Sequence, residues 1–318
     1  MKNIKDYNLD ELKNVMVELG EKPFRAEQIF KWIYVDKVKE FDEMTNLSVE
    51  LREKLKENYT MCNYKILRKQ ESKDGTIKYL FDVLDGNAIE TVLMSYHHGY
   101  SICVSSQVGC KMGCKFCAST GIPFIRNLTS GEIVEQILAV EQDNNIRISN
   151  VVFMGIGEPF DNYDNVINFI RIINDPKALN IGARHITVST CGIVPKIKEF
   201  SSLDLQVNLA ISLHAPNDKI RNEIMPISKA YNLNELMDVL DYYYEKTLRR
   251  ITFEYVLLSG INASKENAIE LANLIKGKNA YVNLINYNET KNIDFKESKK
   301  INEFYDILKK NGIDVTVR

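Results

Sequence analysis

Residues 101–117 read SICVSSQVGCKMGCKFC, a short apolar stretch that leads directly into three closely spaced cysteines. Ser101–Ser106 predicts a buried strand, and Cys110, Cys114 and Cys117 follow it with the spacing C-x3-C-x2-C. Gly109 and Gly113 allow the backbone to turn tightly around a compact object. In a barrel of parallel strands, the loop at the C-terminal end of a strand is where chemistry is placed. The stretch therefore predicts a metal-binding or redox loop after the first strand of a core domain.

Three cysteines in one loop leave two interpretations open. A structural zinc ion takes four ligands, so zinc would need a distant fourth ligand such as His97 or His98. Ferredoxin-type clusters use four cysteines with tighter spacing. Three thiolates instead leave one iron of a [4Fe–4S] cluster open for a substrate or cofactor. We favour the cluster, and zinc remains the alternative.

The chain after residue 100 alternates between apolar strand patterns and amphipathic helix patterns. Thr129 followed by Glu132 predicts a capping box at the start of the first helix. The alternation indicates parallel βαβ units. Six units favour an α/β fold with a partial (β/α)6 barrel, and a doubly wound open sheet is the alternative. The predicted strands are 101–106, 150–154, 185–190, 207–213, 250–258 and 281–286, and the predicted helices are 132–142, 163–173, 194–200, 233–244, 265–275 and 298–311.

The first 95 residues have a different texture. Apolar residues at helical spacing predict helices over 9–19, 24–34 and 49–59, followed by strands over 64–68, 77–83 and 88–95. Asp-Gly pairs at 74–75 and 85–86 are typical of hairpin turns. We therefore predict a small N-terminal helical domain (1–60), a short β-meander connector (61–95) and a core domain (96–318). Residues 313–318 alternate like a strand, and the abrupt end leads us to expect a sequence that is cut short.

Composition excludes several classes of protein. The 318 residues are 45% hydrophobic and 26% charged, as in an ordinary globular protein. Lys+Arg 41 against Asp+Glu 43 gives a net charge of −2, so no global basic field indicates nucleic acid. No secretory signal and no run of ~18 apolar residues is present, so we expect a cytoplasmic protein without a membrane span. The six cysteines are then expected to stay reduced.

The cysteine spacing, with Phe116 before the last cysteine, resembles the signature of the radical S-adenosylmethionine (SAM) superfamily. Other segments resemble the RlmN/Cfr branch of that superfamily: 103–110, 116–120, 126–129, 154–159 and 212–218. The match runs from near Phe24 to the last residue, and Gly157-Glu158-Pro159 is closer to RlmN than to Cfr. The resemblance implies a radical-SAM barrel that methylates C-2 of an adenine in 23S rRNA, and in certain tRNAs.

The resemblance also implies which residues hold the cofactors. Cys110, Cys114 and Cys117 would bind the [4Fe–4S] cluster. Gly157 and Glu158 would bind the SAM ammonium group, although Glu158 could equally be a helix N-cap. The remaining expected SAM contacts are Ser189, Ser212, Leu213, His214 and Asn288. His214 alone would be a satisfied core histidine, and we assign that role to His97, His98 and His185.

The family's chemistry implies two further residues. A SAM-derived radical abstracts hydrogen from a methyl group carried on a cysteine of the enzyme, and the carbon radical adds to adenine. Cys103 matches the cysteine that resolves the adduct by forming a disulfide, and Glu90 matches the proposed proton acceptor. The alternative role of Cys103 is that of a buried small apolar residue, and the alternative role of Glu90 is that of a solvated strand carboxylate. The electron would come from a donor such as flavodoxin or ferredoxin, and we expect a monomer.

The chain departs from the family pattern at three places. The segment with the methyl-carrying cysteine follows the strand that ends here at Arg318, and this chain lacks it. We favour a fragment over a natural variant. Cys191 stands where serine is usual and is a weak candidate for methylation, and Glu289 replaces the usual proline.

The alternative functions are SAM cleavage without methyl transfer and a non-catalytic metal-containing RNA-binding protein.

Recognition of RNA is the least visible feature of the sequence. The helical N-terminal region resembles the family's RNA-contacting domain, and its cations could contact phosphates. A solvated helix face is the alternative, because acidic residues such as Glu27 and Asp36 lie among these cations. A target base would have to be unstacked to react. The candidate cations are Lys22, Arg25, Lys31, Lys37 and Lys39.

Overall fold

The computed structural model describes residues 1–97, 99–290 and 293–318. His98, one of the expected structural histidines, lies outside the described residues. Contacts divide the chain into two compact units. Unit 1 contains residues 1–108 and 125–186, and unit 2 contains residues 109–124 and 187–318. The cysteine loop therefore belongs to unit 2, although its neighbours on both sides in the chain belong to unit 1.

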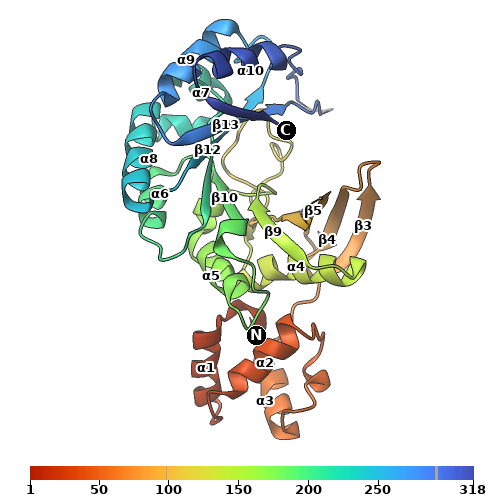
Figure 1. The fold of residues 1–318 in the computed structure, drawn as a ribbon. Helices are drawn as coiled ribbons and strands as arrows, with labels where there is room; N and C mark the ends of the chain where they lie inside the picture. Colours follow the sequence, from red (N-terminus) through yellow and green to blue (C-terminus); the bar gives the residue numbers. More distant parts are fainter. Residues whose placement is uncertain (98, 291–292) are drawn as a thin grey trace. The chain divides into compact units, whose positions relative to one another are not determined.

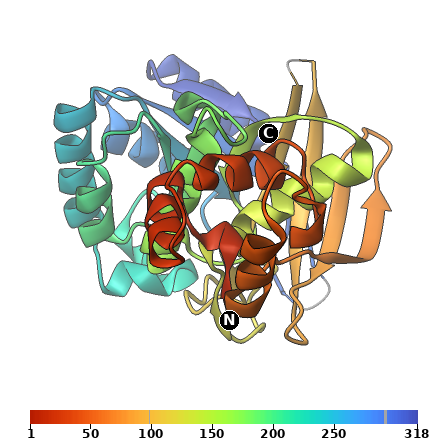
Figure 2. The ribbon, with the colours of Figure 1, turned by 90° about the horizontal axis from the view of Figure 1, so that it is seen from below.

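Unit 1 begins with the three predicted helices, which form a compact group (Figure 2). Asn8 caps the first helix in a capping box, and the Ser48 side chain caps the third. The first and last short strands of this group pair in parallel, which closes it. The elements are β1 (Lys2–Asn3), η1 (Ile4–Asp6), α1 (Leu9–Glu18), α2 (Arg25–Tyr34), η2 (Phe41–Glu43), α3 (Val49–Asn58) and β2 (Tyr59–Thr60).

The sheet of unit 1 combines the predicted meander with the first core strands. Its strands are β3 (Lys65–Glu71), β4 (Ile77–Asp82), β5 (Ala88–Tyr96), β6 (Gly99–Cys103) and β9 (Ile148–Phe153). The first four pair antiparallel in chain order, and β9 pairs in parallel with β6. The predicted boundary at 95/96 therefore falls inside the β5–β6 hairpin. Because backbone hydrogen bonds run through that hairpin, the meander and the first core strand belong to one sheet.

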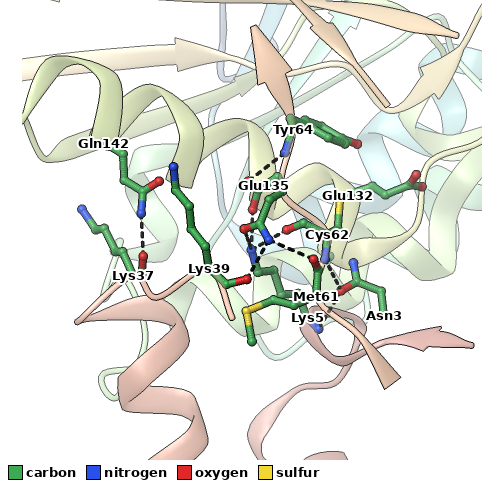
Figure 3. A network of polar contacts seen from close by, with 12 residues as sticks. Asn3, Lys5, Lys37, Lys39, Met61, Cys62, Tyr64, Glu132, Glu135 and Gln142 are labelled. Atoms are coloured by element: carbon green, nitrogen blue, oxygen red, sulfur yellow. Dashed lines mark hydrogen bonds and ion pairs between the residues drawn. The ribbon is translucent and has the colours of Figure 1, made fainter. Parts of the chain in front are cut away.

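The rest of unit 1 follows the predicted helices closely. It contains β7 (Gln107–Val108), β8 (Arg126–Asn127), α4 (Ser130–Asn144), η3 (Pro159–Asn162), α5 (Tyr163–Asn174) and η4 (Ala183–His185). Thr129 and Glu132 form the predicted capping box of α4. A buried ion pair between Lys5 and Glu135 connects the N-terminal group with α4, with 2.6 Å between Nζ and Oε2 (Figure 3).

The strands of unit 2 are all parallel to their neighbours, and their order in the sheet is their order in the chain. A doubly wound sheet would reverse this order at a switch point, so the strands of unit 2 follow the barrel pattern. The strands are β10 (Ile186–Thr190), β11 (Asn208–Ser212), β12 (Ile251–Leu257), β13 (Ala280–Asn286) and β14 (Asp314–Val317). The strand-like alternation after residue 312 thus forms β14.

Helices cover one side of the unit 2 sheet (Figure 1). They are α6 (Val194–Phe200), α7 (Asp218–Ile224), η5 (Pro226–Lys229), α8 (Leu233–Thr247), α9 (Lys265–Ile275) and α10 (Ile301–Lys310). Every residue of β12 is buried, as expected for a central parallel strand. The Tyr255 ring lies 5.2 Å from that of Phe304 on α10, so Glu254, the preceding residue, points to the helix-free face. In the described part of the chain, no helix combines the length and apolar character that a bilayer crossing needs.

Candidate active site

The loop with the three cysteines folds through close contacts of its own backbone. Gly109 has φ +74°, and a Cβ there would lie 2.0 Å from the Pro123 carbonyl oxygen, so only glycine fits. The Cys117 amide donates to the Cys114 carbonyl over 3.1 Å, and the Thr120 hydroxyl donates to the same carbonyl. All three cysteines are partly exposed. The loop therefore presents its thiols from a single short, tightly turned segment.

An apolar cluster of unit 2 supports this loop. We call the buried residues Cys191, Ala215, Ile224, Met225, Val256, Leu258 and Tyr287 the apolar cluster. Met112, Cys114 and Phe116 of the loop pack against it. The Lys115 amide donates to the Ile224 carbonyl over 2.9 Å, which attaches the loop backbone to the end of α7.

His214 joins the loop to the end of β11. Its ring lies 4.8 Å from the Phe116 ring in an edge-on contact, and its Nδ1 accepts the Val256 amide over 3.0 Å. Burial, with a smaller effect of the Arg221 guanidinium, lowers the pKa of His214 to about 3. The neutral ring therefore carries its proton on Nε2.

The predicted SAM contacts of unit 2 lie at the C-terminal ends of neighbouring parallel strands. Ser189 is one residue from the end of β10, and Ser212 is the last residue of β11. Their hydroxyl oxygens are 3.5 Å apart. Leu213 is buried, and its amide donates to the Glu254 carbonyl over 3.1 Å. Asn288 is exposed two residues after β13. The sheet thus brings the Ser189, Ser212 and His214 positions together at one edge, with Asn288 following a further strand at that edge.

The Gly157-Glu158 motif belongs to unit 1 and follows β9. Gly157 has φ +105°, and an added Cβ would lie 2.7 Å from both Gln107 Cβ and Ser106 Oγ. Glu158 is buried, its amide donates to Gln107 Oε1 over 2.9 Å, and its carboxylate accepts the Phe160 amide over 3.0 Å. One carboxylate oxygen of Glu158 therefore caps η3, while the glycine keeps the backbone against the 104–108 segment.

Glu90 and Cys103 share one face of the unit 1 sheet. Cys103 ends β6 opposite Val92 of β5, and Glu90 lies two residues before Val92. The Glu90 carboxylate is 44% exposed and pairs with Lys78, with 3.0 Å between Oε1 and Nζ. The cysteine is half-buried at the strand end, and the carboxylate has the solvated character expected of a surface strand residue.

Comparison with known proteins decides the family. The sequence pattern of the "Ribosomal RNA large subunit methyltransferase N-terminal domain" matches residues 2–61, and that of the "Radical SAM superfamily" matches residues 104–272. A Clostridium novyi protein named "Probable dual-specificity RNA methyltransferase RlmN" is 56% identical, over 100% of this chain and 94% of the relative. The chain belongs to the RlmN family. A Staphylococcus aureus relative of the same name is 51% identical, over 99% of this chain and 88% of the relative.

Solved structures agree with membership of the RlmN family. A radical SAM methyltransferase from Sphaerobacter thermophilus superposes with a TM-score of 0.95 at 42% identity, covering 100% of this chain and 95% of the other. Streptococcus suis SuiB bound to SAM superposes with a TM-score of 0.52 at 16% identity, over 70% of this chain and 52% of the other, which shows the fold alone. The predicted α/β radical-SAM fold is confirmed.

Radical SAM enzymes of this kind use a [4Fe–4S] cluster and SAM, and the donor set of the loop fits the cluster. In the described residues no three His, Cys, Asp or Glu side chains are gathered as a metal site, and the described cysteines form no disulfide. Three thiols on one short loop fit a cluster that keeps one iron open. Cys110, Cys114 and Cys117 would hold it.

Three buried polar residues that shape the site were not singled out from the sequence. Gln107 donates to Asn127 and Asp161, each over 2.8 Å, and holds the Glu158 amide. Asn162 donates to two loop carbonyls, those of Ser106 and Leu128. Arg221 on α7 holds strand ends in unit 2. Position in a loop of short polar residues was the only signal for Gln107, and nothing in the hydropathy pattern separated Asn162 or Arg221 from surface residues.

The candidate RNA-contacting cations of α2 and its flanks differ in how they are used. Lys37 pairs with Glu141, with 2.7 Å between Nζ and Oε2, and Lys31 pairs with Asp36 at the same distance. Arg25 donates to Gln28 over 2.7 Å. Lys22 and Lys39 are exposed. Lys37 thus stabilises the structure, and the exposed lysines are the better candidates for phosphate contacts.

Proposed function

We propose that this RlmN-type enzyme methylates C-2 of an adenine in 23S rRNA, and of an adenine in certain tRNAs. The observation that carries the proposal is the cysteine loop seated, through Phe116 and His214, at the strand edge where the Ser189 and Ser212 hydroxyls lie 3.5 Å apart. Two relatives named as probable dual-specificity RNA methyltransferases are 56% and 51% identical to this chain, over 100% and 99% of its length.

When bound, the cluster and SAM supply the radical chemistry, and the protein's residues bind and orient them. Cys110, Cys114 and Cys117 hold the cluster. Gly157 lets the backbone approach SAM, and Glu158 meets its ammonium group. The other SAM contacts are Ser189, Ser212, Leu213, His214 and Asn288.

Cys103 and Glu90 act on the RNA side of the reaction. Cys103, at the end of β6, resolves the protein–RNA adduct, and Glu90, on the same face, accepts the proton from adenine C-2. In the family, the methyl-carrying cysteine belongs to a segment after the strand that corresponds to β14. A flavodoxin or ferredoxin supplies the electron to a cytoplasmic monomer.

The test is methylation by the anaerobically reconstituted protein. We expect iron and sulfide near four per chain, and 2-methyladenosine in digests of 23S rRNA and tRNA transcripts analysed by mass spectrometry. Cys114→Ala should lose the cluster and all methylation. 8-Methyladenosine would move the enzyme to the Cfr type, and SAM cleavage without methylated RNA would support the abortive alternative. A single zinc ion per chain, without iron, would refute the proposal.

A further inference from the structure

Arg221 is a fully buried cation to which the proposed chemistry gives no role. It lies on α7 and has a relative exposure of 0%. Burying a guanidinium costs several kcal/mol unless its donors are satisfied and its charge is balanced. Such a group in a small helix beside the candidate active site therefore calls for a physical explanation.

Most donors of Arg221 hold backbone carbonyls at the ends of two strands. Nη2 donates to the Cys191 carbonyl over 2.6 Å and approaches the Ser212 carbonyl at 3.5 Å, and Nε donates to the Leu213 carbonyl over 3.3 Å. Cys191 follows β10, Ser212 ends β11, and Leu213 comes directly after it. Arg221 therefore fixes the backbone that carries the Ser212 and His214 positions.

The third nitrogen of the guanidinium is different. Nη1 is buried, and within the described residues it has no hydrogen-bond partner. An unsatisfied donor of a buried cation is among the most costly groups in a protein interior, and the carbonyls around it supply no negative charge. An anion close to Nη1 would therefore stabilise the buried guanidinium.

The cysteine loop can supply an anion in addition to the Asp218 carboxylate at the start of α7, which also interacts electrostatically with Arg221. Ile224, three residues after Arg221, belongs to the apolar cluster and accepts the Lys115 amide over 2.9 Å. Cys114 packs against the same cluster. Burial lowers the pKa of Arg221, and the Cys191 thiol, the Cys114 thiol and the Asp218 carboxylate oppose this shift. The guanidinium and a proposed cluster ligand therefore interact electrostatically, and the ligand packs against the apolar cluster to which Ile224 of α7 belongs.

We infer that Arg221 is a positioning residue that places a buried positive charge next to the cluster and favours its reduced state. A cluster held by three thiolates becomes more negative by one charge when it takes up an electron. A cation in a low-dielectric surrounding stabilises that added charge more strongly than it would in water. Arg221 thereby couples the electron-accepting step to the geometry of the Ser212 and His214 backbone. The inference rests on the proposed function, because it requires the cluster to be bound by the loop.

The test measures the midpoint potential of the cluster in the reconstituted protein without SAM, by redox titration monitored by electron paramagnetic resonance. Arg221→Gln removes the charge and should shift the midpoint to a more negative potential. Lys219→Gln, on the exposed side of the same helix, is the matched control and should not shift it. An unchanged potential in Arg221→Gln with full iron content would overturn the inference. Wild-type protein without a cluster would instead refute the proposed function.

Arg221→Lys separates the charge from the hydrogen bonds. Lysine keeps the positive charge but cannot hold three carbonyls in the fork geometry of arginine. We expect a lower melting temperature with a midpoint potential near that of the wild type. If Arg221→Gln fails to assemble the cluster, this variant decides: a potential that becomes markedly more negative although the charge is retained would contradict the inference.

Discussion

At the scale of single residues, Gly157 shows how a motif depends on a missing side chain. Gly157→Ala would combine left-handed strain with a Cβ 2.7 Å from Gln107 and Ser106. We expect it to lower the free energy of unfolding by about 2–5 kcal/mol, from about 1–2 kcal/mol of strain and about 1–3 kcal/mol of overpacking. Gly75→Ala is the control, because Gly75 has φ +81° with nothing within 4 Å. If Gly157→Ala and Gly75→Ala lose the same free energy of unfolding in urea denaturation, the close contact of the added Cβ with Gln107 and Ser106 has no energetic cost.

Glu254 makes a second prediction at this scale. It is buried on the helix-free face and accepts Asn283 Nδ2 over 2.9 Å. Burial raises the pKa of Glu254, against smaller opposing effects of the Arg318 charge and the Asn283 hydrogen bond. The folded state therefore holds the Glu254 proton more tightly than the unfolded state does. The stability that this proton contributes is present below the unfolded-state pKa of Glu254, and it is lost as pH rises through the folded-state pKa.

Glu254→Gln keeps the shape and the acceptor oxygen but cannot ionise. We expect the variant to be more stable than the wild type at pH 8 and equally stable at pH 4, measured by urea denaturation at both values. A variant that is less stable at pH 8 would mean that the carboxylate is favourably paired in the folded state.

At the scale of elements, the sequence identified most helices but missed α7. The predicted range 194–200 matches α6, and the prediction over 265–275 matches α9. Both carry apolar residues at helical spacing. α7 has only seven residues, and its buried face consists of Arg221 and Ile224. A buried cation is indistinguishable from a solvated one in a hydropathy pattern, so periodicity could not find this helix.

The buried contact between η1 and α4 gives the prediction at this scale. Lys5 Nζ donates to Glu135 Oε2 and to the Cys62 carbonyl, each over 2.6 Å, and the Tyr64 amide donates to Glu135 Oε1 over 3.2 Å (Figure 3). Lys5→Met leaves the Glu135 carboxylate buried without its cation. We expect a loss of about 3–5 kcal/mol in the free energy of unfolding.

A double variant separates the charge from the packing. Lys5→Met with Glu135→Leu removes both charges, and most of the lost stability should return. Lys54→Met, in the exposed pair with Glu50, should leave the denaturation midpoint unchanged. If the double variant is as unstable as the sum of the two single ones, the side chains do not interact energetically.

At the scale of the whole molecule, local sequence patterns say more about the candidate site residues than about the residues that support them. Spacing alone puts Cys110, Cys114 and Cys117 on one loop, and the family resemblance singled out Ser189 and Ser212, which lie near the ends of β10 and β11. Gln107 holds the Glu158 amide across 51 residues of sequence, and no local pattern contains that pairing. Supports of this kind depend on the path of the chain, which periodicity does not encode.

The division into two units leads to the last prediction. The loop 109–124 belongs to unit 2, while Val108 and Ile125 belong to unit 1. A group that binds only the folded loop stabilises the elements against which the loop packs. Removing the cluster anaerobically with a chelator should therefore speed amide exchange in 109–124 and in α7, measured by mass spectrometry of peptides. The N-terminal helices (9–58) should exchange as before, because local openings that leave their contacts intact do not expose them. Cys114→Ala should reproduce this pattern without a chelator, and faster exchange in α1–α3 of either protein would place the stabilising effect of the cluster outside unit 2.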